Sequence, residues 1–159
     1  MTRSRDVLGL AAWLLASLAA GGIGSRFMPD AWYASLAKPS WTPPDAVFAP
    51  VWTALYVLMG VAAWTIWRRA GFRGSPVGLP LFAAQLALNA LWPYLFFGLH
   101  RPGLAYLEIL ILWAVILGVT AIFWRESRAA GSLMLPYLAW VGFASCLNLA
   151  IWRLNPPAA

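Results

Sequence analysis

GLAYLEILILWAVILGVTAIFW, the stretch from Gly103 to Trp124, contains a single charged residue, Glu108. A run of about 20 mostly apolar residues is long enough, as a helix, to cross a hydrocarbon core of about 30 Å. In hydrocarbon every backbone N–H and C=O group needs a partner within the protein, so a lone apolar segment of this length has to be helical. The stretch therefore predicts a transmembrane helix.

Four further stretches have a similar length and similarly few charged residues. They run approximately from Val7 to Phe27, Val47 to Trp67, Leu79 to Leu99, and Ser132 to Trp152. Three of the five spans end in a Trp followed by an Arg, at Trp67-Arg68, Trp124-Arg125 and Trp152-Arg153. A Trp at headgroup depth followed by a cation in water is typical of a membrane boundary. We expect an all-α integral membrane protein, a bundle of five transmembrane helices that forms one domain over residues 1–159.

Composition supports this class and excludes others. Of the 159 residues, 62% are hydrophobic and only 10% are charged, which leaves too little polar surface for a soluble domain. The net charge of +6 does not indicate nucleic-acid binding, because the basic residues sit at the ends of apolar segments instead of clustering on one face. Cys146 and His100 are the only cysteine and the only histidine. No intrachain disulfide, metal site, haem ligation or Ser-His-Asp set is expected, and no cofactor. We expect His100 to be a solvated loop residue.

Orientation follows from the basic residues that flank the spans. Seven lie on the side of the N-terminus and four on the other side, so a cytoplasmic N-terminus is favoured. The first span has an alternative interpretation as a cleaved signal peptide, with Ser17-Leu18-Ala19 as the cleavage site. A stripe of small residues favours a retained helix that packs closely on another helix, within the bundle or across a homodimer. The stripe consists of Ala12, Ala16, Ala20 and Gly24.

The loop of residues 28–46 is long and reads MPDAWYASLAKPSWTPPDA. Its prolines fix φ and restrict the conformation of the residues before them. Its aromatic residues provide apolar side chains that can pack against the helices. We favour the interpretation that this loop is a lid that covers a binding site. The alternative is an interfacial segment whose aromatic side chains lie among the headgroups.

Polar side chains inside the third span share one helix face. Gln85, Asn89 and Trp92 are spaced by four and three residues. Pro93 removes the hydrogen bond to the Asn89 carbonyl and predicts a kink there. Polar groups at membrane depth usually face the protein interior. A ligand site and simple interhelical hydrogen bonding are equally compatible with this pattern.

Aromatic residues recur at helical spacing in two other spans. Trp52 and Tyr56 lie one turn apart in the second span, and Trp140, Ala144 and Asn148 follow one another at four-residue spacing in the fifth. From spacing alone, core packing is the commoner explanation. The content of 11 Trp nevertheless favours flat apolar ligands that stack. Glu108, the only acid deep in a span, is a functional candidate with snorkelling as the alternative.

Longer motifs make the chain resemble the TspO/MBR family of tryptophan-rich sensory and translocator proteins. Residues 32–44, WYASLAKPSWTPP, are similar to the family's loop motif WYxxLxKPxWxPP. Further matching blocks are GSRF at 24–27, PVWT at 50–53, QLALN at 85–89, WP at 92–93, FFG at 96–98, PYLAW at 136–140, FA at 143–144 and LN at 147–148. These blocks occur in the family's order and span nearly the whole chain.

The resemblance implies a five-helix homodimer that binds porphyrins and related tetrapyrroles, benzodiazepine-type and isoquinoline drugs, and in some members sterols such as cholesterol. The implied location is a multi-pass position in a membrane, here the bacterial cell membrane. The positions implied for ligand binding are Trp52, Tyr56, Asn89, Trp140 and Ala144, with Gln85 and Asn148 as additions. The positions implied for the lid are Trp32, Tyr33, Lys38 and Pro39. The mammalian sterol motif at the end of the fifth span has no counterpart, because no Tyr lies near Arg153.

The leading functional hypothesis is a ligand-binding sensor or receptor. A transporter of tetrapyrroles or sterols is the first alternative, although no inverted repeat is visible. Light-dependent oxidation of a bound porphyrin is the second, with Trp52 and Trp140 as the indoles that would transfer electrons with the photoexcited porphyrin and no metal required.

Overall fold

The computed structural model describes residues 3–156, and within this range every regular element is helical. Five helical segments are long and apolar enough to cross a membrane, which confirms the predicted fold class. They are α1 (Arg3–Gly24), α3 (Asp45–Ala70) with the short η1 (Gly71–Gly74), α4 (Gly78–Pro93) with η2 (Tyr94–Gly98), α5 (Pro102–Glu126) and α6 (Arg128–Leu154). The short α2 (Ala31–Ser35) lies in the first loop.

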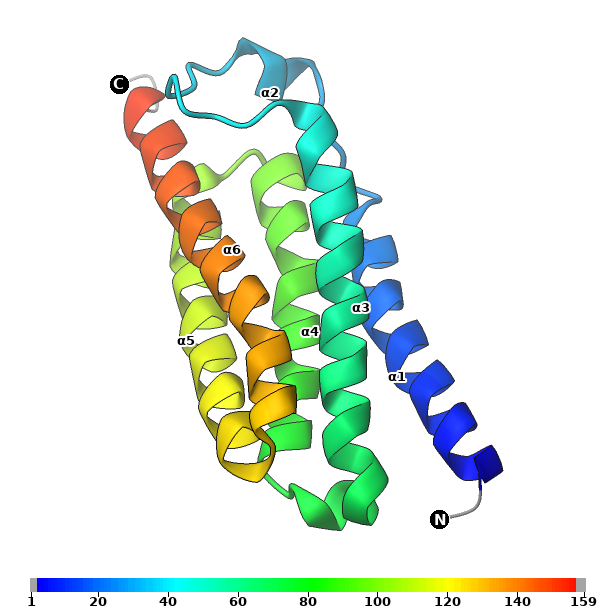
Figure 1. Ribbon diagram of the computed structural model, residues 1–159. Coiled ribbons are helices and arrows are strands. Elements are labelled where there is room, and N and C mark those ends of the chain that lie inside the picture. The colour runs from blue at the N-terminus through cyan, green and yellow to red at the C-terminus, as the bar shows by residue number, and fades with distance from the viewer. Residues whose placement is uncertain (1–2, 157–159) are drawn as a thin grey trace.

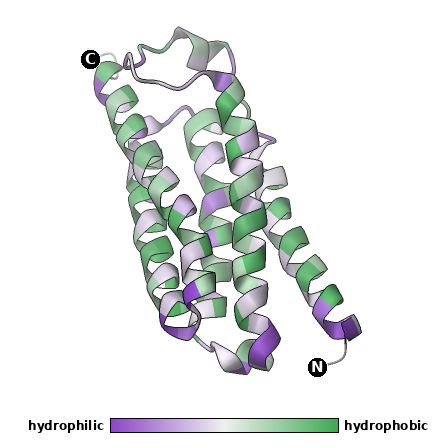
Figure 2. Cartoon of the chain, viewed as in Figure 1, coloured by the Kyte–Doolittle hydropathy of each residue, from purple (hydrophilic) through white to green (hydrophobic). Residues whose placement is uncertain are grey.

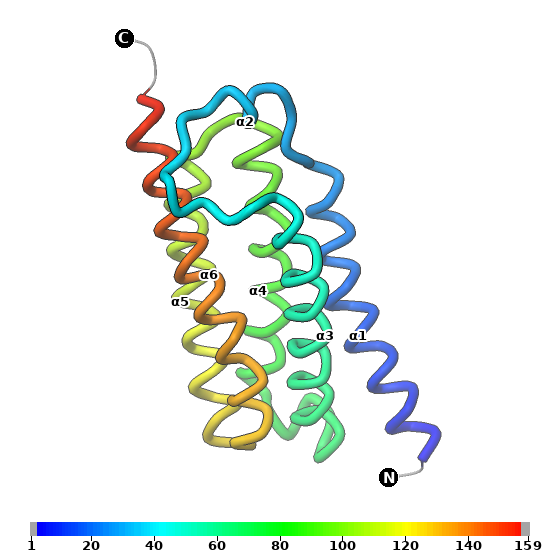
Figure 3. Tube along the Cα trace, turned by 45° about the horizontal axis from the view of Figure 1, so that its top comes forward, coloured from blue at the N-terminus to red at the C-terminus, as the bar shows by residue number. Residues whose placement is uncertain are grey.

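The long helices form one bundle with α1 at its side (Figure 1). The helix α1 contacts α3 and α4, and its N-terminal end diverges from the other helices (Figures 1 and 3). The first loop and α2 cover the opposite end of the bundle, where α6 also ends (Figure 3). Apolar residues occupy the lengths of the helices and polar residues gather at their ends (Figure 2), the distribution that a hydrocarbon layer requires.

The helices run past most of the predicted span boundaries. The first helix begins at Arg3 instead of Val7, and the last ends at Leu154 instead of Trp152. The hydrogen-bond ladder of a helix does not stop where hydrocarbon meets water, so charged flanking turns stay helical. The first helix ends earlier than predicted, at Gly24 instead of Phe27, and a tightened turn follows in which the Phe27 N–H donates to the Gly24 carbonyl at 3.0 Å.

Only half of the small-residue stripe predicted on α1 is buried within the bundle. Ala20 and Gly24 are buried, but Ala12 and Ala16 are exposed. The inward face is completed by Gly9, Trp13 and Ser17. The helices α1 and α3 approach closely at glycines: a Cβ on Gly21 would lie 2.3 Å from the Tyr56 ring, and a Cβ on Gly60 would lie 3.0 Å from the Leu14 backbone. A contact of Ala12 and Ala16 across a homodimer stays a prediction.

The third span changes helix type after its proline. The α-helix runs unbroken through Asn89 to Pro93, and a π-helical turn follows from Tyr94 to Gly98. Its closing bond runs from the Leu99 N–H to the Tyr94 carbonyl at 2.8 Å. Wide turns of this kind commonly occur at functional sites, and this one lies beneath the first loop.

Candidate ligand-binding site

A chain of side-chain hydrogen bonds links α3, α4 and α6 inside the bundle. The Tyr56 hydroxyl donates to Asn89 Oδ1 at 2.6 Å, and Asn89 Nδ2 donates to the Tyr137 hydroxyl at 3.1 Å. That hydroxyl donates in turn to Gln85 Oε1 at 2.8 Å. Gln85, Asn89 and Tyr137 are buried and Tyr56 is half-buried. The structure thus brings together three predicted site residues, Tyr56, Gln85 and Asn89, around a fourth, Tyr137, that the site prediction omitted.

Tyr137 could have been found from its sequence context. It lies in the PYLAW block at 136–140, and a hydroxyl at the middle of an apolar span requires a hydrogen-bond partner. Its position three residues before Trp140 places both on neighbouring parts of one helix surface. The spacing of the aromatic residues alone did not distinguish Tyr137 from an ordinary core residue.

Asn148 lies in a separate polar cluster. Its Oδ1 accepts a hydrogen bond from Trp92 Nε1 at 3.0 Å, and its Nδ2 donates to the Pro102 carbonyl at 2.8 Å. These bonds tie α6 to α4 and to the beginning of α5. The amide of Asn148 is therefore engaged in interhelical hydrogen bonding, the alternative that the sequence left open for the polar residues of the spans.

Aromatic side chains of α3 and α6 face each other beside the hydrogen-bonded chain. Trp52 stacks on Tyr56 with centroids 5.6 Å apart and meets the ring of Tyr137 edge-on at 6.3 Å. Trp140 meets Phe48 edge-on at 5.8 Å and lies 5.6 Å from Phe143. We call the set Phe48, Trp52, Tyr56, Trp140 and Phe143 the aromatic wall. All five side chains are half-buried, so the wall is shielded from solvent without being fully covered.

Trp140 carries a hydrogen-bond donor that is unpaired in the described part of the chain. Its Nε1 is buried and has no hydrogen-bond partner among the residues that the structure describes. A buried donor without an acceptor costs about 1–3 kcal/mol, so such groups call for an explanation. Ala144, one turn further along α6, is half-buried and has a small side chain. The two predicted residues therefore supply one unpaired donor and a side chain of little bulk.

The first loop is folded down onto the end of the bundle. Its Asp30 caps α2 by accepting a hydrogen bond from the Tyr33 amide N–H at 3.1 Å. Tyr33 is buried against Phe96 and Phe97, with ring centroids 6.2 and 5.3 Å away. Trp41, near the end of the loop, lies 5.7 Å from the ring of Phe143 in the aromatic wall. The loop therefore covers the wall from one end.

Two residues for which the sequence predicted no such contact hold this loop. The ring of His100 stacks on Trp32 at 4.2 Å, and its Nε2 lies 3.0 Å from Asp30 Oδ2. His100 is exposed, as expected for a solvated loop residue, but it is also a contact point for the first loop. Asn155, at the end of α6, accepts a hydrogen bond from the Ala37 N–H and donates one to the Ala37 carbonyl, both at 2.9 Å. A polar residue near a chain end gives no sequence signal for such a role.

Hydrogen bonds within the loop hold its charged side chains Asp30 and Lys38. Lys38 Nζ donates to the Tyr33 carbonyl at 2.7 Å and lies 4.4 Å from the centre of the Tyr33 ring. The Tyr33 amide N–H, with a smaller contribution from His100, holds the pKa of Asp30 below its usual 3.8, and burial raises the pKa of the Tyr33 hydroxyl above 10.0. Asp30 therefore stays charged near neutral pH. Pro39 follows Lys38, and its carbonyl accepts hydrogen bonds from the N–H and the hydroxyl of Thr42.

Glu108 is buried in α5, with only 7% of its surface exposed. Neither carboxyl oxygen has a hydrogen-bond partner in the part of the chain that the structure describes. Snorkelling therefore does not explain this residue. Over the same residues, no three His, Cys, Asp or Glu side chains come together in a group that could hold a metal ion.

Comparison with known proteins gives consistent matches over nearly the whole chain. The model of the TspO/MBR family matches residues 10–153. The chain is 42% identical to "Tryptophan-rich protein TspO" of Chlorobaculum tepidum, over 96% of this chain and 99% of that protein. It is 40% identical to "Protein CrtK" of Rhodobacter capsulatus, over 92% of each. It is also 40% identical to the human "Translocator protein", over 84% of this chain and 82% of that protein.

Proposed function

This chain belongs to the TspO/MBR family of multi-pass membrane proteins, and we propose that it is a ligand-binding sensor or receptor for porphyrins and related tetrapyrroles. The observation that carries the proposal is the buried indole N–H of Trp140 within the aromatic wall, which has no hydrogen-bond partner among the described residues. An apolar wall with one convergent donor is the arrangement expected for a flat, largely apolar ligand with a few acceptor atoms. Drugs of the benzodiazepine and isoquinoline classes share these features and are proposed as further ligands.

The contacts across the wall favour opening to such a ligand. Among the ring pairs of the described residues, one joins wall residues of α3 and α6, the edge-on pair Phe48 with Trp140. An aromatic pair contributes only about 0.5–1.5 kcal/mol beyond its buried area. A macrocycle that stacks on Trp52 and Trp140 replaces that contact with a larger apolar surface. The hydrogen-bonded chain behind Tyr56 stays intact and fixes the position of the wall.

The loop of residues 28–46 is proposed to act as the lid of this site. Its Lys38 has two ammonium hydrogens left after bonding to the Tyr33 carbonyl, and these can pair with a propionate group of the ligand. Arg26, at the end of α1, offers a second cation on the same side of the membrane. The prediction of a homodimer in a bacterial cell membrane with a cytoplasmic N-terminus is kept as part of the proposal.

An absorbance titration with protoporphyrin IX in detergent, in the dark, tests the proposal. Trp140→Phe removes the indole donor while keeping most of the apolar area, and we expect it to weaken binding about tenfold. Trp124→Phe is the matched control, because Trp124 is exposed at the far end of α5 and belongs to neither the wall nor the loop. Equal affinity of the parent and of Trp140→Phe would place the ligand elsewhere.

Light-dependent oxidation of the bound porphyrin, with dissolved dioxygen as the electron acceptor, is the second candidate function. It is favoured by the two indoles of the wall, since Trp52 is stacked on a tyrosine whose hydroxyl is hydrogen-bonded. The same titration under illumination separates the two functions. A new absorption band that forms only in light, and that Trp52→Phe abolishes, supports turnover, whereas an unchanged spectrum supports binding alone.

A further inference from the structure

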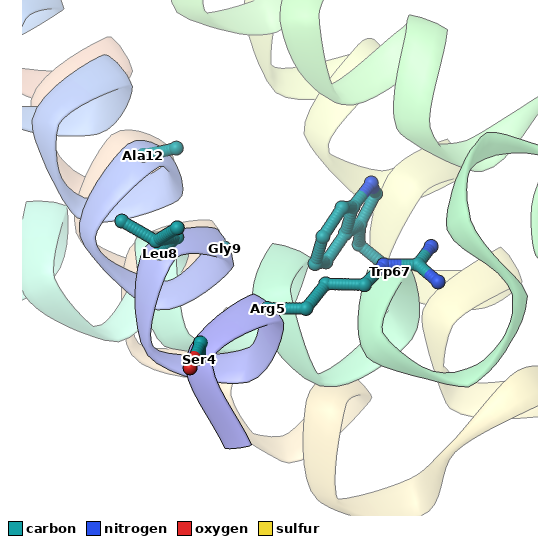
Figure 4. Close-up of a pocket in the computed structure, with 6 residues that line it drawn as sticks. All are labelled: Ser4, Arg5, Leu8, Gly9, Ala12 and Trp67. Carbon is teal, nitrogen blue, oxygen red and sulfur yellow. The ribbon is translucent and has the colours of Figure 1, made fainter. Parts of the chain in front are cut away.

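We propose that a groove between α1 and α3 binds an anionic glycerophospholipid, with the headgroup phosphate on Arg5 and one acyl chain along Leu8 and Ala12. The groove has a volume of about 530 Å³ and lies at the end of the bundle opposite the first loop. Its lining consists of Ser4, Arg5, Leu8, Gly9, Ala12 and Trp67 (Figure 4). We call it the Arg5 groove. It shares no residue with the aromatic wall, so this inference does not depend on the proposed function.

The walls of the groove are built by a glycine and a tryptophan. Gly9 is buried against the indole of Trp67, and a Cβ at this position would lie 2.2 Å from the ring. The ring therefore fits against the α1 backbone only because residue 9 has no side chain. Leu8 and Ala12, on the exposed face of α1, continue the apolar surface toward the middle of the membrane, and Leu8 is 70% exposed. An alkyl chain would bury both side chains.

Arg5 is held in place without an acidic partner. Its guanidinium lies 5.2 Å from the centre of the Trp67 ring, and Figure 4 shows the side chain extending from α1 toward that indole. Among residues 3–156, no carboxylate lies within ion-pair distance of Arg5. Its neighbour Arg68 differs, because it pairs with Asp6 at 3.7 Å. A positioned guanidinium with free donors suits a phosphate, which it can contact through two parallel hydrogen bonds.

The groove lies at the depth where a lipid changes from polar to apolar. Trp64 and Trp67 mark the headgroup level on α3. Arg68 and Arg69 come directly after Trp67. This end of the molecule carries seven basic residues against two acidic ones, whereas the loop end carries four against two. The excess of positive charge favours an anionic headgroup over a zwitterionic one. The hydroxyl of Ser4, which also lines the groove, is a further donor for the headgroup.

Native mass spectrometry of the detergent-solubilised protein tests this site. The probes are phosphatidylglycerol and phosphatidylcholine with the same acyl chains, each titrated against the parent, Arg5→Gln and Arg73→Gln. Arg73 is exposed in η1 at the same end and does not line the groove, so both variants lose the same charge. Loss of general surface attraction lowers affinity by at most about fivefold per basic residue. Loss of charge-assisted hydrogen bonds at the site is expected to lower it at least tenfold for Arg5→Gln.

A second variant tests the acyl-chain wall. Leu8→Gln leaves the charge unchanged and replaces an exposed side chain, so the helix is expected to fold normally. It should weaken phosphatidylglycerol binding by several-fold, because the chain loses apolar area. Equal losses in Arg5→Gln and Arg73→Gln would reduce the effect to general electrostatics and overturn the proposal. Displacement of the lipid by an equal concentration of inorganic phosphate, or a change of oligomer size in Arg5→Gln with unchanged lipid binding, would overturn it as well.

Discussion

Tyr137→Phe is the sharpest test of the hydrogen-bonded chain in the bundle. The substitution removes one oxygen and leaves two buried groups without partners, Asn89 Nδ2 and Gln85 Oε1. Hydrogen bonds between helices in membranes contribute about 0.6 kcal/mol each on average, and a buried polar group left unpaired costs about 1–3 kcal/mol. We therefore expect a total loss of about 2–3 kcal/mol. For a chain of this size, that loss lowers the melting temperature by on the order of 5–10 °C.

Thermal denaturation in one detergent, followed by circular dichroism, measures this effect. Tyr94→Phe is the matched control, because it also removes one tyrosine hydroxyl, from a residue that is exposed and makes no side-chain hydrogen bond within the described chain. A double-mutant cycle with Gln85→Leu should show coupling of at least about 0.5 kcal/mol, since the two residues share a 2.8 Å bond. Melting of Tyr137→Phe within 1 °C of the parent, or additive effects in the cycle, would refute the reasoning.

Three further predictions concern the loop and the outer face of α1. Asn155→Ala removes both hydrogen bonds to Ala37, so porphyrin should dissociate several-fold faster in stopped-flow measurements, and an unchanged dissociation rate would mean that the loop does not gate the site. The folded-state pKa of Asp30 lies below its usual 3.8 because of the Tyr33 amide, so the stabilisation of α2 is complete above about pH 4 and is lost as the pH falls through that lower value. Asp30→Asn keeps a capping side chain without the charge, so limited proteolysis of the loop between pH 6 and 3 should vary with pH in the parent and much less in the variant. Ala16→Leu, on the exposed side of α1, should leave the melting temperature of the monomer unchanged and reduce dimer content in light scattering. Unchanged dimer content would assign that face to lipid.

The predicted functional residues divide according to the range of their interactions. Gln85 and Asn89 were predicted on one face of the third span, and their hydrogen-bonded chain runs along that face because i and i+4 residues are neighbours on any helix. The contacts of His100 and Asn155 with the first loop were not predicted, because each residue lies far from that loop in the sequence, and Asn155 contacts Ala37 across 118 positions. No local pattern encodes such a contact.

The five spans could be predicted from local sequence alone, because the thickness of the hydrocarbon layer and the need to satisfy each backbone group act on single segments. The sequence did not determine which face of each helix turns inward. In a soluble helix the polar face marks the outside. Lipid is as apolar as the protein core, so the inward and outward faces of a transmembrane helix are similarly hydrophobic. Only the tertiary structure showed that Ala12 and Ala16 point outward while Gly9 and Trp13 point inward. Only it showed that the amide of Asn148 is engaged between helices while the indole N–H of Trp140 is left open. These orientations depend on close approach and hydrogen bonding between different segments. Neither produces a periodic pattern in the sequence.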